Sequence, residues 1–375
     1  MKICFWGNIS GALNGKTDGG GELQLGLLAK ALARGGNEVV VIDYEVEEDY
    51  ITEDGIKVFK IEGWNTGIRV IRSFTHRLPK LYKSLKAQKA DVYYCRIRDF
   101  RHILAFWAAR KVKGKFVLGL ASDLDAMNFS MRLKHQYLVS AKGLWSFSSG
   151  MLIEIIYPFL LRKSDLVLVQ HQGQKNILEK KGIKSIIVSN LIDISKFPTS
   201  SGPVQKDFIY IGWLSQRKGF PEFFEIVKKC PKQTFKIVGP PCDKAGYLFY
   251  KKLSSFPNVT LLGKLRHSDV LKNIINSQAL ISTSQMEGFP NVFIEAWACG
   301  IPVLSLYVDP GDTIKKENLG IVTHGNQQKL IEAIAINKTN GVFAQRAKDY
   351  IERNHILNTN KIKEINSIFR QLINE

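Results

Sequence analysis

Short apolar runs alternate with amphipathic stretches along the whole chain. In the first half, runs rich in valine and isoleucine predict strands over residues 2–7, 38–43, 91–95, 116–120, 166–170 and 186–189. Between the first two runs, Leu25, Leu28 and Leu32 fall on one helical face, and two glycines at 35 and 36 end that helix. Strands that alternate with helices in this way predict a parallel sheet covered by helices.

The alternation restarts after a polar break. Residues 196–203 have the composition of a linker. Beyond it, apolar runs predict strands over residues 207–212, 234–239, 258–262, 278–282 and 302–306. We therefore expect two α/β domains with parallel sheets, residues 1–195 and 204–357, and an amphipathic helix over 358–375 that is able to pack back on the first domain. Ligands of such sheets bind at the carboxyl ends of the strands, and the cleft between two domains is the natural site.

Length and composition agree with two domains. A chain of 375 residues with 45% hydrophobic content is too long for one ordinary core. The five cysteines are scattered without metal-finger spacing, so we expect free thiols in a reducing compartment. We see no signal-peptide pattern, and the apolar stretch over 144–161 is interrupted by Glu154, Pro158 and serines. These features predict a cytoplasmic protein.

The net charge of +19 indicates an anionic partner, such as a nucleotide, an acidic lipid surface or a nucleic acid. Residues 69–115 contain fourteen bases and only two acids. Ile68, Ile71 and Phe74 form an apolar stripe beside some of these bases, which suits an anionic membrane surface. An ordinary helix with a solvated face fits the same pattern. We find no module signature of DNA or RNA binding and expect no nucleic acid partner.

The most informative segment is 281–305, which reads I-S-T-S-Q-M-E-G-F-P-N-V-F-I-E-A-W-A-C-G-I-P-V-L-S. It predicts a strand end, a loop with Glu287, and a helix that carries Glu295, is capped by Asn291 and stops at Gly300. The two carboxylates can accept hydrogen bonds from hydroxyls, while the amino end of the helix suits an anion. A sugar nucleotide has both features. A plain strand–loop–helix with solvated acids fits equally well.

Three other loops follow predicted strands. Three glycines, at 19–21, allow close backbone approach to a phosphate or a sugar, or simply form a flexible turn. Arg217 and Lys218 can clamp a diphosphate, or form a solvated charge pair. Gly239 and the two prolines after it form either one wall of a base pocket or a turn.

Taken together, these segments resemble a family. The run E-G-F-P-N-V-F-I-E, residues 287–295, is similar to the E-x7-E motif of the retaining family-4 glycosyltransferases, which have the GT-B fold. Residues 19–41, 188–197 and 211–219 resemble that family's opening glycine loop, its entry to the linker and its "G-R-L…K-G" loop, in the right order. The resemblance implies two Rossmann-like domains that face each other across a cleft.

The resemblance also implies roles for individual residues. Arg217 and Lys218 would hold the donor diphosphate, Glu287 would bind donor-sugar hydroxyls, and Glu295 would bind the ribose. The backbone beside Glu287 would assist, and further residues would line the phosphates, the reacting carbon and the base. These supporting residues are Gly288, Phe289, Pro290, Asn291 and Val292 beside Glu287, Gly20 and Gly21 at the phosphate, and Gly239 and Leu265 at the base. The family needs neither a metal nor another cofactor, and its donors are UDP- or GDP-sugars.

The chain departs from the family pattern at one place. Many relatives carry a histidine after the strand at 116–120, where this chain has Ala121, Ser122 and Asp123. Asp123 either contacts the sugar or acceptor, as a catalytic residue, or caps the following helix. His171, which follows another strand, is either a residue of the site or a packed core histidine.

These features predict a hexosyltransferase that moves a sugar from a nucleotide sugar to a glycan or a lipid-linked acceptor with retention. The family and the basic stretch favour bacterial surface polysaccharide synthesis, in the cytoplasm or on the inner face of the plasma membrane. A nucleotide-sugar epimerase of the same fold, an inactive scaffold and a basic nucleic-acid-binding protein are the alternatives.

Overall fold

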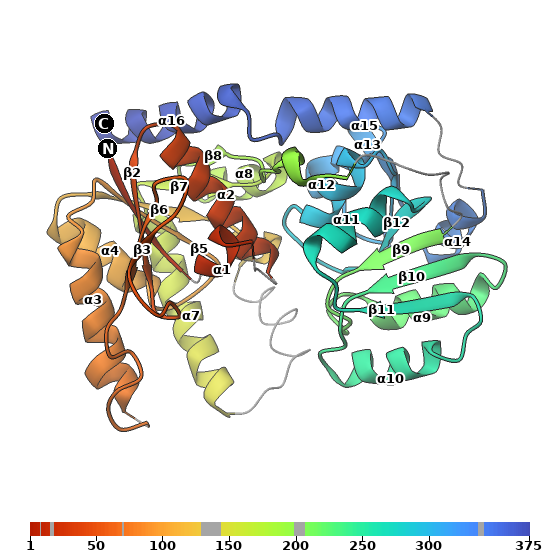
Figure 1. Cartoon of the computed structure of the whole chain (residues 1–375), viewed down its shortest axis with the longest axis horizontal. Coiled ribbons are helices and arrows are strands. Elements are labelled where there is room, and N and C mark those ends of the chain that lie inside the picture. The colour runs from red at the N-terminus through yellow and green to blue at the C-terminus, as the bar shows by residue number, and fades with distance from the viewer. Residues whose placement is uncertain (8, 16–18, 70, 129–143, 199–206, 337–340) are drawn as a thin grey trace. The chain divides into compact units, whose positions relative to one another are not determined.

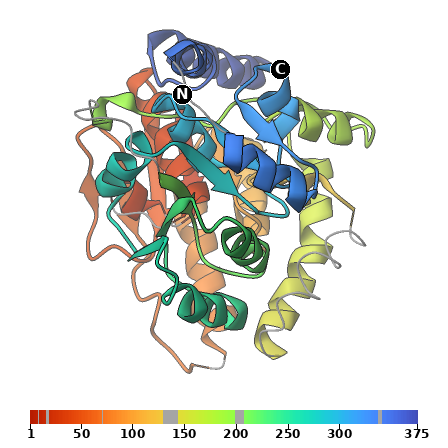
Figure 2. The ribbon, with the colours of Figure 1, turned by 90° about the vertical axis from the view of Figure 1, so that its right-hand side faces the viewer.

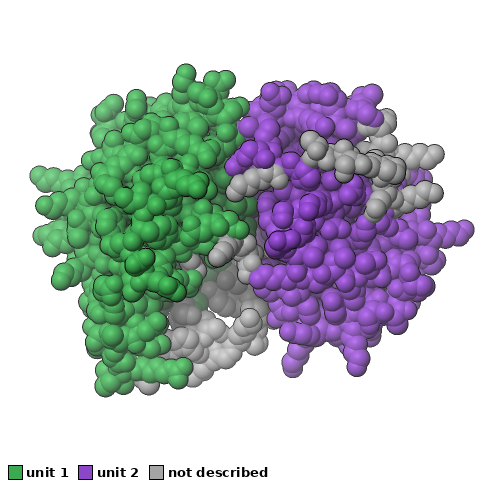
Figure 3. All heavy atoms as spheres, in the orientation of Figure 1, with its two compact units in different colours: residues 1–191, 357–375 green, residues 192–356 purple. Residues whose placement is uncertain are grey.

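The computed structural model describes the chain except for residues 8, 16–18, 70, 129–143, 199–206 and 337–340 (Figure 1). The chain forms two compact units, which are coloured separately in Figure 3. Unit 1 comprises residues 1–191 and 357–375, and unit 2 comprises residues 192–356. The stretch expected to be a linker, 196–203, starts at the last residue of a short 3-10 helix, Ile194–Lys196, and residues 199–203 lie outside the described part.

Unit 1 contains an eight-stranded sheet in the order β3-β4-β2-β1-β5-β6-β7-β8. Every pair is parallel except β3 with β4. The expected strands are present within two residues of their predicted bounds. The edge strand β3 and its neighbour β4 were not predicted because they are short and mostly not fully buried. The bounds are β1 Lys2–Trp6, β2 Glu38–Asp43, β3 Tyr50–Ile51, β4 Lys57–Lys60, β5 Val92–Arg96, β6 Lys115–Gly119, β7 Leu166–Val169 and β8 Ser185–Ile187.

Helices cover both faces of this sheet, and a buried apolar cluster lies on each side. The tail forms α16, which packs on α2 and buries Phe369 completely. No helix in the described part of the chain is long and apolar enough to cross a membrane. The helices are α1 Ser10–Leu13, α2 Gly20–Arg34, a π-helix Ser73–Arg77, α3 Leu78–Ala87, α4 His102–Lys111, α5 Asp123–Ala126, α7 Leu144–Lys163, α8 Gln172–Glu179 and α16 Thr359–Asn374.

Unit 2 contains a six-stranded, fully parallel sheet in the order β11-β10-β9-β12-β13-β14. Figure 2 shows helices on both faces of it. The strands are β9 Asp207–Ile211, β10 Thr234–Val238, β11 Val259–Gly263, β12 Ala279–Ser282, β13 Val303–Ser305 and β14 Gly320–Val322. The helices are α9 Phe220–Lys229, α10 Lys244–Leu253, α11 His267–Ile275, α12 Asn291–Ala298, a 3-10 turn Pro310–Asp312, α13 Thr313–Lys316, α14 Gln327–Ile336 and α15 Gly341–Asn354.

Each sheet has one point at which the strand order reverses. In unit 2 the chain runs from β9 outward through β10 and β11, and then returns to place β12 on the other side of β9. In unit 1 the corresponding point lies between β1 and β5. The connections that leave neighbouring strands at such a point diverge to opposite faces of the sheet, which makes it the usual binding position of an α/β sheet.

Candidate functional site

Most of the predicted donor-site residues lie at the carboxyl edge of the unit 2 sheet. Lys218 follows β9, Gly239 follows β10, Leu265 follows β11 and Glu287 follows β12. These four strands are consecutive neighbours in the sheet, in the order β11-β10-β9-β12. Segments that are far apart in sequence therefore meet at one edge, and β9 and β12 flank the reversal point.

Gly219 fixes the loop that carries Arg217 and Lys218. Its φ of +66° is in the left-handed region, and a Cβ atom there would lie 1.9 Å from the carbonyl oxygen of Thr283. Thr283, just after β12, donates its hydroxyl to the Gly219 carbonyl at 2.7 Å. The Tyr210 hydroxyl donates to the Lys218 carbonyl at 3.1 Å. The β9 loop is thus held against the end of β12, with no space for a side chain between them.

This packing brings Lys218 to Glu287. The Lys218 ammonium donates a hydrogen bond to Oε1 of Glu287, and the two side chains are 24% and 20% exposed. Burial opposes ionisation of Glu287, but the charges of Lys218 and Arg217 and a hydrogen bond from Ser284 hold its pKa below the usual value. Arg217 is exposed on the same loop. The site therefore presents two cations beside an ionised carboxylate.

Glu295 lies on α12, the helix that follows the Glu287 loop, and it has a partner that the sequence did not predict. Its carboxylate, on α12, is buried, and its Oε1 lies 2.8 Å from Nε2 of His267, the first residue of α11. The expected cap is wrong: Pro290 occupies the N-cap position and Asn291 is the first helical residue. The position of His267 soon after a predicted strand was the only available sequence signal for its role.

The backbone around these side chains is closely packed. Gly239 has a φ of +131°, and a Cβ atom there would lie 1.9 Å from the Gly212 carbonyl oxygen. The Phe289 ring is 6% exposed and contacts the rings of Trp297 and His355, so this side chain belongs to the core. Pro290 has no N–H, so it cannot donate a backbone hydrogen bond to a ligand as Gly288, Phe289, Asn291 and Val292 could.

The predicted residues of the N-terminal half lie in unit 1. Gly20 and Gly21 form the first turn of α2, and a Cβ atom on Gly21 would lie 2.7 Å from the Ile97 side chain. The absence of a side chain at Gly21 therefore permits the close approach of the segment after β5.

Asp123 does not cap α5. Ser122 is the N-cap, and Asp125 closes the capping box by accepting from the Ala121 and Ser122 amides at 2.8 and 2.9 Å. Oδ1 of Asp123 instead lies 2.8 Å from Nε2 of His171 and accepts from the Gln174 amide at 2.9 Å. The Asp123 side chain is 30% exposed. It is thus oriented by neighbours at the carboxyl edge and remains accessible to a ligand.

Asp123 and Asp125, two residues apart in the chain, therefore have separate roles. Asp125 is buried and forms an ion pair with Arg98 at 3.1 Å.

Across the described ranges of the chain, no three histidine, cysteine, aspartate or glutamate side chains are grouped so that they could hold a metal ion.

The basic stretch is a smaller surface than its composition indicates. Arg77 donates to Asn65 and to the Trp64 carbonyl, and Arg101 and Arg110 pair with aspartates. The apolar stripe also consists of a buried part and an exposed part. Leu81 and Leu85 are in the core, whereas the three exposed side chains at its start are Ile68 at 70%, Ile71 at 47% and Phe74 at 64%. Exposed bases that continue from this surface are Lys83, Lys86 and Lys89.

Part of the chain is similar in sequence to known glycosyltransferases. Residues 205–336 match the family model described as glycosyl transferases group 1. An uncharacterized glycosyltransferase of Methanocaldococcus jannaschii is 30% identical over 184 residues, which are 43% of this chain and 45% of that protein. One subunit of the human phosphatidylinositol N-acetylglucosaminyltransferase is 24% identical over 226 residues, 56% of this chain and 46% of that protein. The chain thus spans less than half the length of these relatives.

Solved structures resemble the whole chain. A sucrose-phosphate synthase from Thermosynechococcus elongatus has a TM-score of 0.76 at 16% identity, over 100% of this chain and 99% of that one. HepE from Anabaena, solved with UDP and glucose, has a TM-score of 0.71 at 18% identity over 99% of both chains. WaaG, a glycosyltransferase involved in lipopolysaccharide biosynthesis, has a TM-score of 0.67 at 15% identity, over 98% of this chain and 99% of that one. These similarities confirm the GT-B fold.

Proposed function

We propose that this chain, a family-4-like glycosyltransferase of the GT-B fold, transfers a hexose from a nucleoside-diphosphate sugar to an acceptor hydroxyl with retention. The observation that carries the proposal is the pairing of Lys218 with Glu287 at the reversal point of the unit 2 sheet. It supplies cations for a diphosphate and a carboxylate for sugar hydroxyls within one small site.

The leaving group explains the two cations. Cleavage of the bond between the sugar C1 atom and the phosphate oxygen leaves negative charge on the diphosphate and an oxocarbenium-like sugar. Arg217 binds two phosphate oxygens through its planar fork, and Lys218 acts as a point charge. Stabilisation of developing charge by fixed groups is usually the largest catalytic contribution, about 10²–10³-fold for one donor.

The carboxylates recognise the neutral parts of the donor. When the diphosphate takes the Lys218 ammonium, Glu287 is released to accept hydrogen bonds from sugar hydroxyls. Glu295, oriented by His267, accepts from the ribose hydroxyls. Gly239 and Leu265 frame the base, and Gly20 and Gly21 line the phosphate and the reacting carbon. The donor is a UDP- or GDP-sugar, and neither a metal nor another cofactor takes part.

Retention follows from attack on the same face as the departing diphosphate. The acceptor oxygen forms its bond to C1 as the bond from C1 to the phosphate oxygen breaks, and the acceptor proton passes to the diphosphate. Asp123, oriented by His171 and Gln174, contacts the acceptor or the transferred sugar.

The acceptor is a glycan or a lipid-linked sugar of a bacterial surface polysaccharide. Two similar proteins support this choice, because one is named for lipopolysaccharide biosynthesis and another for transfer to phosphatidylinositol. The exposed Ile68, Ile71 and Phe74, with the nearby lysines, bind an anionic membrane surface on the cytoplasmic side.

A thermal-shift panel of UDP- and GDP-sugars tests the donor site. We expect a nucleotide sugar that stabilises the wild type to lose most of its shift with Arg217→Ala, Glu287→Ala and Glu295→Ala. Lys228→Ala, at an exposed lysine of α9, is the control and keeps the shift. A shift that survives both Arg217→Ala and Glu287→Ala overturns the proposed site. Conversion of one labelled nucleotide sugar into its epimer without an acceptor would instead identify an epimerase.

A further inference from the structure

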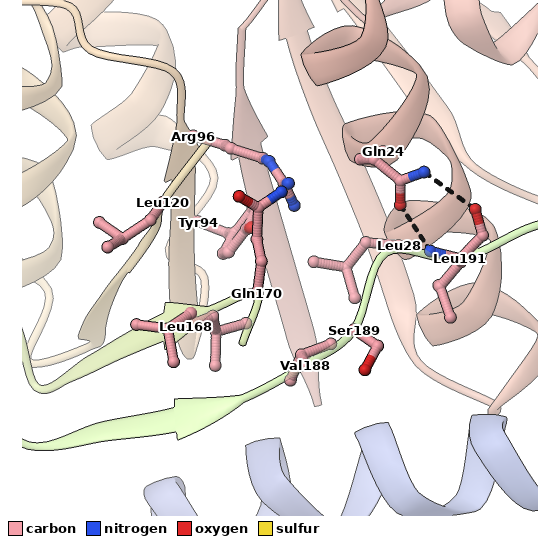
Figure 4. Close-up of a pocket in the computed structure, with 11 residues that line it drawn as sticks. Gln24, Leu28, Tyr94, Arg96, Leu120, Leu168, Gln170, Val188, Ser189 and Leu191 are labelled. Carbon is pink, nitrogen blue, oxygen red and sulfur yellow. Dashed lines mark hydrogen bonds between the residues drawn. The ribbon is translucent and has the colours of Figure 1, made fainter. Parts of the chain in front are cut away.

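A small pocket lies inside unit 1, at the carboxyl ends of β5, β7 and β8 and against α2 (Figure 4). The pocket leaves about 10 Å³ in which the centre of a water-sized sphere can lie. The polar groups that line it include Tyr94, Arg96 and Gln170, and leucine and valine side chains form much of the remaining wall. None of the residues proposed above for donor or acceptor binding lines this pocket.

Two buried polar atoms at the pocket have no hydrogen-bond partner in the described part of the chain. They are Nε of Arg96 and the hydroxyl oxygen of Tyr94. Arg96 is 8% exposed and Tyr94 is completely buried. The guanidinium donates from Nη2 to Oδ1 of Asn190 at 3.0 Å, which is a neutral amide, and it lies beside the Tyr94 hydroxyl.

The nearby carboxylates do not pair with Arg96. Asp125 and Glu154 both bind Arg98, at 3.1 and 3.0 Å. Asp125 acts on Arg96 through its charge but makes no ion-pair contact with it, and burial raises the pKa of this carboxyl. A buried guanidinium without an ionic partner is costly, so an additional anion would stabilise it.

The hydrogen bonds of the lining side chains favour an anion over a water molecule. Asn190 Oδ1 already accepts from both Arg96 and Gln170, and Gln170 Oε1 accepts from Gln174. The buried side-chain atoms of the pocket that lack a partner are therefore the Arg96 Nε, a donor, and the Tyr94 hydroxyl, which can donate and accept. Both groups can donate to a halide, and only an anion also neutralises the charge of the buried guanidinium.

We propose that this pocket binds one small monovalent anion of the size of chloride, held by Arg96 Nε and the Tyr94 hydroxyl. The anion neutralises Arg96 at the end of β5, in a pocket that is also lined by residues at the ends of β7 and β8. It also lies close to Gln24 of α2 (Figure 4). The Gln24 side-chain amide donates to the Leu191 carbonyl at 2.9 Å and accepts from the Leu191 N–H at 2.7 Å. Its role is to stabilise unit 1, and it does not depend on the proposed transfer reaction.

Thermal unfolding of the full chain in sodium chloride and in sodium gluconate, at equal ionic strength, tests the proposal. We expect a saturable rise in Tm in chloride alone, about 3–6 °C when chloride exceeds its Kd tenfold. Arg96→Met removes this rise and Tyr94→Phe, which conserves the packing, reduces it. Arg162→Met, at an exposed arginine of α7, retains it. Equal Tm values of the wild type in the two salts overturn the proposal.

A crystal of the wild type grown in sodium bromide gives a test that needs no variant. An anomalous bromide peak within hydrogen-bond distance of Arg96 Nε and the Tyr94 hydroxyl supports the anion site. A water molecule or no density at that position, in a crystal with bromide bound elsewhere, refutes it. This measurement also decides the matter if Arg96→Met does not fold.

Discussion

Lys218 donates a hydrogen bond to Glu287 although the two residues are 69 positions apart in the chain. Their loops leave β9 and β12, which are neighbours in the sheet because the chain builds β10 and β11 on one side of β9 before it returns to the other. The pair is therefore a product of the strand order, and Gly219 fixes its spacing through contact with Thr283.

Replacement of Lys218 tests its role at the leaving group. We expect Lys218→Met to lower kcat by about 10²–10³-fold, because one charge that stabilises the departing diphosphate is lost. Steady-state kinetics with the nucleotide sugar found in the thermal-shift panel measures the effect, and Lys228→Met is the matched control. An unchanged kcat would show that Lys218 does not stabilise the transition state.

Gly219→Ala tests the packing of the β9 loop. The substitution combines a positive φ with a collision against the Thr283 carbonyl, so we expect a loss of at least about 2–3 kcal/mol of unfolding free energy. Gly182 has a similar φ of +67° but open space around a Cβ atom, so Gly182→Ala costs only about 1 kcal/mol. Urea unfolding of both variants gives the comparison, and equal losses would contradict the close contact.

Asp123→Asn separates acceptor contact from donor binding. If the carboxylate binds an acceptor or sugar hydroxyl, its loss lowers kcat/KM for the acceptor by about 10–100-fold. Nucleotide affinity, measured by calorimetry with the nucleoside diphosphate, stays within about twofold of the wild type. Asp312→Asn, at an exposed position of unit 2, is the control. A variant with normal transfer would assign Asp123 a purely structural role.

His102 gives unit 1 a defined pH dependence. The side chain is 2% exposed, and burial lowers its pKa from 6.5 to about 4, with Asp99 opposing the shift and Arg101 adding to it. Between these values the unfolded chain binds the proton more strongly, so the unfolding free energy falls as the pH falls, by roughly 3 kcal/mol in all.

His102→Gln should remove this part of the pH dependence. Denaturant unfolding at pH 7 and at pH 4.5 measures the loss for the wild type and the variant. His324→Gln, at an exposed histidine, should retain the wild-type loss. The same loss in His102→Gln as in the wild type would show that His102 is not the responsible group.

The exposed apolar side chains near the start of α3 predict membrane binding. We expect Phe74→Ser to weaken co-sedimentation with vesicles of phosphatidylcholine and phosphatidylglycerol about tenfold, because a large apolar side chain no longer enters the interface. Ile336→Ser removes an equally exposed apolar side chain from unit 2 and is the control. Equal binding by the two variants would exclude this surface as the contact.

The strand–helix alternation and the loops that carry the candidate chemistry could be predicted from the amino-acid pattern alone. Buried parallel strands are apolar on both faces, so runs such as 38–43 and 278–282 stand out from the amphipathic helices around them. Glycine and proline mark the loops, which is why Glu287 and Arg217 could be placed after strands. The strands β3, β4 and β14 were not predicted because they are short and mostly not fully buried, so they lack the continuous apolar run of the central strands.

The contacts between side chains from distant segments could not be predicted in this way. The local sequence indicated that Asp123 is a possible helix cap, but Ser122 and Asp125 cap this helix. Asp123 instead contacts His171, which follows a neighbouring strand. The composition of residues 69–115 indicated one basic surface, but the side chains of Arg77 and Arg101 have partners within unit 1. Such pairings depend on strand order and on which groups lose contact with water. These properties arise from contacts between distant segments, and a local pattern does not contain them.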